Sequence, residues 1–336
     1  MWRIKNHTAF ASDRAVLTDA RGHQIWVVAA KGTYDLAESG EVTLAAEQEP
    51  VTLSPQYYGE PGRSSLLRDT ELVATHPGTD VTLNAVAQAP GEAPIASMTV
   101  SVRVGRLRRE LQVFGDRTWI REDDRLEISD PTPFRQMPIV WERAYGGTEI
   151  EDGQVAQVAE NPIGQGFSTD PDTLAESPVP NIEDPAKPIV AGEEPPPPVG
   201  LGAIAPDWAP RRDYGGTFDQ DWQRSRAPLW PADFDERHFV TAPLGLHSAR
   251  PLRGGEPVHL EGLTPHSPWT FRLPRVHVIF ETVNAGRKIR QKTKLERVII
   301  EPDRRKLVMV WCGRMDCGAH ARNVSHTLIY TKESIR

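Results

Sequence analysis

Alternation of apolar and polar side chains is the feature that most constrains this chain. It is clearest in residues 97–104, SMTVSVRV, where every second side chain is apolar: Met98, Val100, Val102 and Val104. A two-residue period places these side chains on one face of a β-strand, whereas a helix needs a period of 3.6 residues. Residues 79–88 alternate in the same way. We therefore expect a strand at each place.

Further strands are expected through the N-terminal third. Residues 25–30, IWVVAA, form a continuous apolar run that is typical of a strand buried on both faces. Shorter strands are expected at residues 41–44, 71–75 and 111–114, the last after a turn at residues 105–109. We interpret this part of the chain as an antiparallel β-meander.

The C-terminal part returns to strands. Residues 276–282, 295–301 and 306–311 are rich in β-branched and other apolar side chains, and residues 302–304, Pro-Asp-Arg, have the chemistry of a tight turn. We expect a three- or four-stranded antiparallel end piece, followed by one more strand at residues 326–330.

Proline and glycine separate these runs. The chain has 30 Pro and 26 Gly, above the usual share, so loops are abundant and helix is scarce. The fold class that follows is mainly β, with antiparallel sheets in a sandwich- or barrel-like arrangement and long ordered loops. We divide it into an N-terminal antiparallel region (1–129), a central region rich in Pro, Gly and Trp packed on it (130–275) and a C-terminal β-hairpin region (276–336), in one integrated fold.

Residues 199–246 lack any sustained apolar period yet hold many aromatic residues, among them Trp208, Tyr214, Phe218, Trp222 and Trp230. Disordered segments are poor in aromatic side chains, so this region is predicted to be an ordered, irregular loop. It also contains a short repeat, because Arg-x-Tyr-Gly-Gly-Thr occurs at residues 143–148 and again at 212–217. Each copy is expected to form a tight turn. The two copies then serve either as equivalent packing turns or as parts of one binding groove.

Charge and apolar patterning exclude several classes of protein. A formal net charge of −7 argues against nucleic-acid binding, which needs concentrated Lys and Arg. No apolar run approaches the 18 residues of a membrane span, and the N-terminus shows no apolar signal-peptide core, so a cytoplasmic location is expected. Two cysteines provide no disulfide framework.

Patterns for metal binding and catalysis are weak. Cys312, Cys317 and His320 have a C-x₄-C-x₂-H spacing, with His326 beyond, but no second Cys pair supports a zinc site. No phosphate-binding loop or nucleophile elbow is present. We therefore expect no metal, no cofactor, no small-molecule substrate and no catalytic residue. An alternative hypothesis is a hydrolase that uses loop carboxylates such as Asp219 and Asp221 together with nearby arginines.

The central motifs resemble one bacterial family when they are taken in order. They are PxxWERAYGG at 138–147, NPIGxGF at 161–167, the segment from Gly202 to Trp222 with YGGTFDxxW, and RAPLWP with the following Asp-Phe at 226–234. The chain is similar, over about residues 1–315, to the uncharacterised-domain family encoded beside type VI secretion spike proteins, PAAR-type tips and pentapeptide-repeat proteins. The resemblance implies an adaptor or chaperone that binds a secreted effector and helps to load it onto the spike. It implies no catalytic residues.

We therefore expect a non-enzymatic adaptor whose partners are an effector and a spike or tip protein. Trp, Tyr and Arg side chains dominate the energetics of protein interfaces. The expected partner-binding residues are Trp208, Tyr214, Phe218, Trp222, Trp230, Arg143, Tyr145 and Arg212. Core packing of each tryptophan is the alternative to partner binding. A structural component that leaves the cell with the spike is a further alternative to the adaptor.

Overall fold

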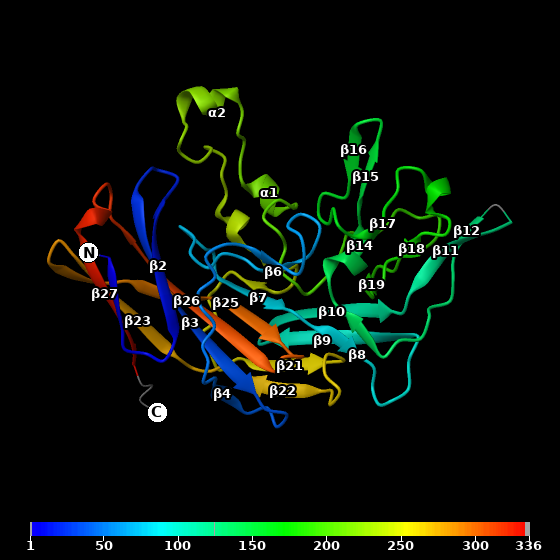
Figure 1. Cartoon of the computed structure of the whole chain (residues 1–336), viewed down its shortest axis with the longest axis horizontal. Coiled ribbons are helices and arrows are strands. Elements are labelled where there is room, and N and C mark those ends of the chain that lie inside the picture. The colour runs from blue at the N-terminus through cyan, green and yellow to red at the C-terminus, as the bar shows by residue number, and fades with distance from the viewer. Residues whose placement is uncertain (1, 124, 333–336) are drawn as a thin grey trace.

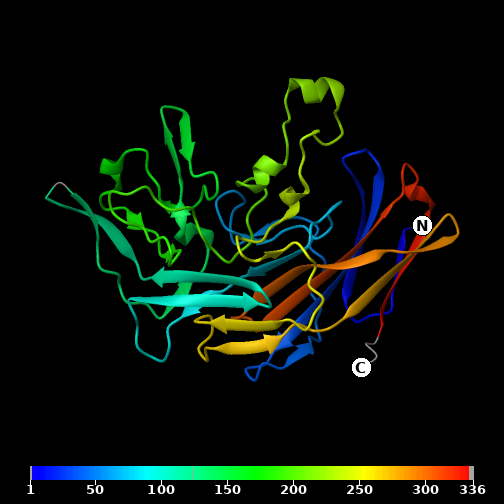
Figure 2. The same cartoon turned by 180° about the vertical axis from the view of Figure 1, so that it is seen from behind.

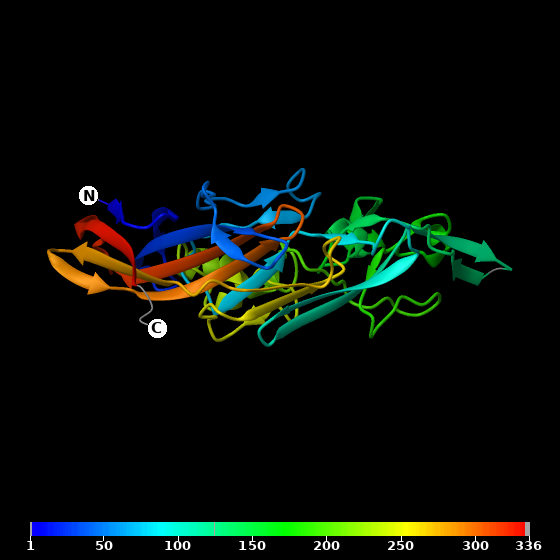
Figure 3. The ribbon, with the colours of Figure 1, turned by 90° about the horizontal axis from the view of Figure 1, so that it is seen from below.

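A computed structural model describes residues 2–123 and 125–332. Strands make up 44% of the chain and helices 7%, with two short α-helices, so the predicted mainly-β class is confirmed. The molecule is elongated and flat when seen from below (Figure 3). The N-terminus and the last strand lie at one end, and the hairpin of strands β11 (Arg117–Glu122) and β12 (Arg125–Ile128) lies at the other (Figure 1).

A seven-stranded sheet is the centre of the fold. Its path runs β2-β3-β26-β25-β7-β20, and β4 pairs with β3. These strands are β2 (Ala11–Thr18), β3 (Gln24–Leu36), β26 (Lys306–Asp316), β25 (Lys292–Glu301), β7 (Thr79–Leu83), β20 (His247–Ser248) and β4 (Val42–Leu44). Strands β7 and β25 are parallel, whereas β3, β26 and β25 are antiparallel neighbours.

Two further sheets flank this centre (Figure 2). One has five strands: β19 (Ile182–Glu183), β10 (Leu107–Phe114), β9 (Ser97–Val104), β21 (Pro257–Glu261) and β22 (Trp269–Arg272). The other has four: β1 (Arg3–Asn6), β27 (Val324–Lys332), β23 (His277–Asn284) and β24 (Arg287–Arg290). The sheets in the described part of the chain are open, so the sequence-based alternative of a barrel-like closure is wrong.

Short elements build the rest of the molecule. Strand β11 pairs with both β12 and β18 (Pro178–Val179), and the remaining pairs are β13 (Gln136–Pro138) with β8 (Val86–Gln88), β14 (Tyr145–Gly146) with β17 (Gln165–Gly166), β15 (Thr148–Glu151) with β16 (Gln154–Gln157), and β5 (Gln56–Tyr57) with β6 (Leu66–Arg68). The helices are α1 (Arg211–Tyr214), α2 (Gln220–Ser225) and the 3₁₀ turns η1 (Trp141–Arg143), η2 (Pro171–Leu174), η3 (Glu236–Phe239) and η4 (Ala321–Asn323).

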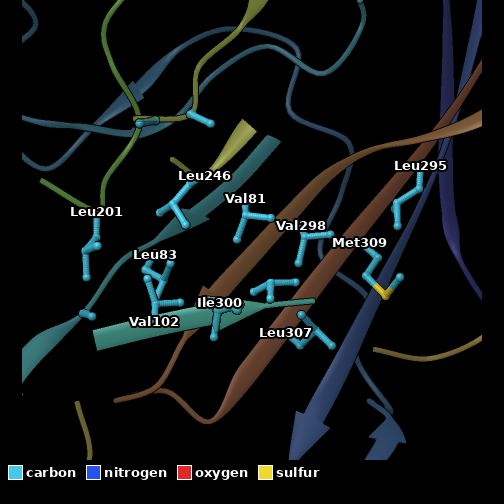
Figure 4. Packing of buried hydrophobic residues seen from close by; sticks show 14 of the residues in the cluster. Val81, Leu83, Val102, Leu201, Leu246, Leu295, Val298, Ile300, Leu307 and Met309 are labelled. Atoms are coloured by element: carbon cyan, nitrogen blue, oxygen red, sulfur yellow. The ribbon is translucent and has the colours of Figure 1, made fainter. Parts of the chain in front are cut away.

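One face of the seven-stranded sheet forms the main apolar core. Val81, Val298 and Met309, on three adjacent strands, belong to the same buried cluster as Val102 of β9 (Figure 4). Phe280 of β23 joins the cluster from the four-stranded sheet. The alternating side chains of each strand therefore bury one row against two other sheets, as the period-two pattern requires.

The opposite face of the seven-stranded sheet carries both apolar and charged side chains. Apolar side chains such as Val27, Val308 and Val310 form a second buried cluster there with Val51 and Leu72. Both of these last residues belong to the segment 45–76, which covers this face. Because both faces are covered, β3 is buried almost throughout, as its continuous apolar run predicted.

Buried charges attach the covering segment to this face. Lys31 of β3 pairs with Glu71 at 2.8 Å, and Arg68 pairs with Glu301 of β25 at 2.8 Å. Asp80 of β7 lies 2.9 Å from His247 Nδ1 and accepts hydrogen bonds from both the backbone N–H and the hydroxyl of Thr241. Each charge has a partner at hydrogen-bond distance, which is the condition under which charges are tolerated in a protein interior.

Several sequence-based expectations are wrong about where strands and turns begin and end. Residues 71–75 form no strand, because the Glu71 side chain binds Lys31 while the chain crosses the sheet. The run at 79–88 divides into β7 and β8 near Asn84, whose side-chain amide donates to Glu301 at 3.0 Å. The expected turn at 105–109 is shorter, since β10 begins at Leu107.

The two sequence-based topologies are also wrong. Instead of a meander, β3 and β7 lie in one sheet separated by β25 and β26, while β9 and β10 lie in another. The C-terminal strands do not form one end piece, because β25 and β26 enter the seven-stranded sheet, whereas β23 lies in the four-stranded sheet between β24 and β27. Strands with two apolar faces need cover on both sides, so β25 and β26 take central positions.

Substitution of Asp80 by Asn tests the buried polar layer. The change removes the buried negative charge among His76, His247 and Arg297, so we expect a loss of about 3–5 kcal/mol in the free energy of unfolding. Urea denaturation followed by circular dichroism measures it. Asp13→Asn is the matched control, because Asp13 pairs with an exposed Arg14, and its effect should stay within about 0.5 kcal/mol. Equal effects of the two substitutions would contradict this view.

The Asp80 contribution is expected to depend on pH. Burial acts to raise the pKa of Asp80, but His76, His247 and Arg297 outweigh it and hold the pKa below its ordinary value. A carboxyl whose pKa is lower in the folded state stabilises the fold above its unfolded pKa of about 4 and loses that effect as the pH falls further. The stability difference between the wild type and Asp80→Asn should therefore narrow between about pH 5 and pH 3, as measured by urea denaturation. A constant difference would contradict it.

Candidate interaction surface

Residues 211–240 form an arm that projects from the body of the molecule (Figures 1 and 2). The arm rises through α1 and α2 and returns through η3. Helix α1 ends at Tyr214 and is followed by Gly215 and Gly216. Gly216 has a φ of 82°, a conformation that glycine adopts without strain. Asp219 begins α2, because its carboxylate accepts a hydrogen bond from the Trp222 backbone N–H at 2.7 Å.

Arg211 clamps the base of the arm. Its buried guanidinium donates to the carboxylate of Asp69 at 2.8 Å, to the Ile204 carbonyl at 2.6 Å and to the His238 carbonyl at 2.8 Å. The His238 ring lies 2.8 Å from the Arg211 carbonyl in return. Burial lowers the pKa of Arg211 and Asp69 opposes that effect. The two chains of the arm are thus tied to each other and to the segment that covers the sheet.

Aromatic contacts stiffen the lower half of the arm. The rings of Trp230 and Phe234 have centroids 4.3 Å apart, and Phe239 packs against both. The Arg237 guanidinium lies 4.1 Å from the centre of the Tyr214 ring, and Asp235 holds that guanidinium at 2.7 Å. Tyr214 and Trp230 are therefore partly buried within the arm rather than fully available to a partner.

The upper half of the arm carries exposed apolar surface. Phe218 is 63% exposed and its ring packs edge-on against Trp222, with centroids 4.8 Å apart. The Trp222 indole N–H donates to the Leu229 carbonyl at 2.8 Å. Arg226 donates to the Ala20 carbonyl at 3.2 Å, which ties the arm to the turn between β2 and β3. Phe218 is thus presented on a support that is already folded.

A second projection, the hairpin, consists of β15 and β16 and leaves the same side of the body (Figure 1). Ile150 and Val155 are directly opposite partners in it and are 73% and 61% exposed. Asp152 and Gly153 form its turn, with φ values of 49° and 79°. Asp-Gly between alternating residues is a strong hairpin signal, so the sequence held the information for this element, which our sequence-based prediction missed.

The two copies of Arg-x-Tyr-Gly-Gly-Thr adopt different structures. In the first, Tyr145 and Gly146 form strand β14, so the expectation of a tight turn there is wrong. Buried Asn161 of the NPIGQGF motif fixes this copy, since its side-chain amide donates to the carbonyls of Trp141 and Tyr145. In the second copy, Arg212 and Tyr214 belong to helix α1 and Gly215 lies in the turn that follows it. The two copies are therefore not equivalent turns.

Of the other predicted partner-binding residues, three lie outside the arm and one lies on it. Trp208 is only 1% exposed and packs at 90° against Trp141 in the core. Arg143 donates to the side chains of Asp116 and Asn181. Tyr145 is partly buried, and burial, followed by Glu194 and Glu160, raises the pKa of its hydroxyl. Arg212 is exposed on the arm beside Asp213.

The structure brings Tyr214, Phe218, Trp222, Trp230 and Arg212 together on the arm. Arg143 and Tyr145 lie near the base of the hairpin, and Trp208 lies below the arm in the core. The arm therefore carries predicted residues, whereas the hairpin carries Ile150 and Val155, which were not predicted.

Two of the loop carboxylates accept hydrogen bonds from neighbouring parts of the arm. Asp219 caps α2, and Asp233 accepts two hydrogen bonds from Thr217, which lower its pKa. Cys312 and Cys317 are buried free thiols, and burial raises the pKa of Cys312. Within residues 2–123 and 125–332, no cluster of three or more His, Cys, Asp or Glu side chains is arranged to hold a metal ion. Across the same residues, no helix has the length and hydropathy needed to span a membrane.

Substitution of Arg211 by Met should loosen the arm. It leaves the Asp69 carboxylate buried without its partner, so amide hydrogens in residues 211–240 should exchange faster in hydrogen–deuterium exchange. Arg212→Met is the matched control and should leave exchange unchanged, because the exposed Arg212 side chain pairs with the exposed side chain of Asp213. Similar exchange in the Arg211 variant and the wild type would show that the clamp does not order the arm.

Comparison with known proteins gives one relationship. No curated protein and no solved structure matches the chain. A family model described as an uncharacterized protein conserved in bacteria, DUF2169, matches residues 21–312. The match spans most of the seven-stranded sheet, the arm and the hairpin. The chain therefore belongs to this bacterial family.

Proposed function

We propose that this protein is an adaptor that binds a secreted effector in the cytoplasm and assists its loading onto the spike and PAAR-type tip of a type VI secretion machine. The observation that carries the proposal is the pair of ordered projections on one side of the molecule, each presenting exposed apolar side chains. The ordered series of central motifs supports the choice of partner. The adaptor role needs no catalytic group.

The construction of the arm is suited to binding a protein. Phe218 rests on Trp222, and hydrogen bonds from Trp222 and Arg226 fix the chain below it. A surface that is ordered before binding loses little conformational entropy on docking. Aromatic side chains on such a support are the usual centres of binding energy. The arm therefore provides an anchor rather than a flexible tether.

The hairpin adds a second contact of different character. Ile150 and Val155 form an apolar pair, while Glu149, Glu151 and Asp152 make the same element acidic. A stable interface buries about 1,600 Å² in total, so contact with both projections would enlarge the buried area. A partner is therefore expected to contact both projections, with basic residues facing the hairpin.

Affinity purification of the tagged protein from its native bacterial host tests the proposal as a whole. Mass spectrometry of the captured material should identify an effector together with a spike or tip protein. Recovery of neither, from cells in which the secretion machine is expressed, would contradict the adaptor role.

Single substitutions on the two projections locate the binding surface. Phe218→Asp and Ile150→Asp each place a charge in the expected apolar contact, so each should weaken binding of the captured effector about 30-fold or more. Isothermal titration calorimetry with the purified effector measures this. Leu53→Asp is the matched control, because Leu53 is 61% exposed but lies outside both projections. Equal affinity in all three variants would exclude the two tips as the binding surface.

A further inference from the structure

The structure contains a pocket of about 430 Å³. Among the elements that line it are β8 and β22, which lie away from the two projections (Figure 1). Its walls come from segments far apart in the sequence: the turn between β25 and β26, strand β8, and the connection from β21 to β22. Leu263 and Trp269 provide apolar lining. This volume lies within the range of pockets that hold small ligands.

Hydrogen bonds between the walls hold the pocket open. The Gln88 backbone N–H donates to the Gly262 carbonyl at 2.8 Å, which joins β8 to the end of β21. The Trp269 indole N–H donates to the Ala37 carbonyl at 3.2 Å, and the Val86 backbone N–H donates to the Asp303 carboxylate at 3.0 Å. The pocket therefore exists without a ligand to assemble it.

The polar groups of the pocket form a chain of amides directed toward one carboxylate. The Gln136 side-chain amide donates to the side-chain oxygen Oε1 of Gln88 at 3.0 Å, and the Gln88 side-chain amide donates to the Asp303 carboxylate at 3.1 Å. Among the described residues, no Lys, Arg or His side chain pairs with Asp303. Thr264 Oγ1 is buried without a hydrogen-bond partner in the same part of the chain. Acceptor capacity therefore remains unused on the pocket wall.

The charges that line the pocket favour a positive ligand. Arg305 is bound by Glu38, so its charge is already compensated, whereas that of Asp303 is not. Partial burial raises the pKa of Asp303, because the carboxylate has lost part of its contact with water. A bound cation would compensate this loss by pairing with the negative charge. An anion would meet an unpaired carboxylate here, and a wholly apolar ligand would leave that carboxylate desolvated.

We propose that this pocket binds an organic cation, a guanidinium or primary ammonium carried on an aliphatic chain. The cationic head hydrogen-bonds to Asp303, and the chain packs against Trp269 and Leu263. Such a group reaches the pocket either as a free amine or as a basic side chain of a bound peptide. The pocket is separate from the arm and the hairpin, so its occupation does not depend on the adaptor role.

Isothermal titration calorimetry of the full chain with agmatine and with N-acetyl-arginine amide tests the proposal. Agmatine represents the free amine and the amide represents a peptide side chain. Binding of either at a dissociation constant of about 1 mM or below supports the proposal and identifies the source. N-acetyl-norleucine amide, which is uncharged, should not bind. Absence of binding by both cations, or equal binding of the uncharged amide, would overturn the proposal.

Substitutions assign the binding to this pocket. Asp303→Asn keeps an acceptor but removes the charge, so it should weaken binding of the cation that binds by about tenfold or more. Glu38→Gln should also weaken it, because Arg305 then contributes an uncompensated positive charge. Glu38 is 55% exposed in a turn, so this variant reports on the pocket even where Asp303→Asn disturbs folding. Asp13→Asn, on a distant strand, is the control.

Unchanged affinity in Glu38→Gln and in a folded Asp303→Asn would place the binding elsewhere and overturn the proposal. The same variants should capture the effector as the wild type does, because the pocket lies apart from the projections. Loss of cation binding with retained effector capture therefore separates this inference from the adaptor role. Conversely, Phe218→Asp should lose effector capture and keep cation binding, which shows that the adaptor surface works independently of the pocket.

Discussion

The buried charges between the seven-stranded sheet and residues 45–76 are the interactions on which the rest of the structure depends. Lys31 and Glu71, and Arg68 and Glu301, join strands to a segment without long regular structure of its own. Apolar contact would hold such a segment against the sheet but would not select one position for it. Charged groups in a dry interior tolerate little displacement from their partners, so they define where the segment crosses the sheet.

The arm depends on the same layer. Asp69, in the covering segment, pairs with Arg211 at the base of the arm. Arg297 of β25 donates one hydrogen bond to the Thr70 carbonyl and another to the Thr241 hydroxyl. The base of the arm that carries Phe218 is therefore joined to the central sheet through two polar contacts, Arg297 with Thr70 and Asp69 with Arg211. This explains how a region rich in Pro and Gly presents aromatic side chains in a defined place, which a binding surface requires.

Local pattern predicted the strands better than their partners. Alternation at residues 97–104 corresponds to β9, and the apolar run at 25–30 lies within β3. The same reasoning was wrong at residues 71–75, where Glu71 serves a buried ion pair rather than a strand. For the candidate surface, the sequence predicted Phe218 and Trp222 through their aromatic character. It also predicted Trp208, which lies in the core, because residue type alone does not show which other segments cover a side chain.

The sequence by itself determined where β-structure occurs, because the two-residue period and the turn residues act over a few neighbouring positions. Tertiary structure alone decided the pairing of β7 with β25 and the burial of Trp208 beside Trp141, since both depend on residues far away in the chain. The repeated Arg-x-Tyr-Gly-Gly-Thr makes the point within one molecule: it is a strand where Asn161 binds it and a helical turn where Arg211 is clamped. Glycine permits both conformations, and the contacts made by Asn161 and Arg211 determine which one each copy adopts.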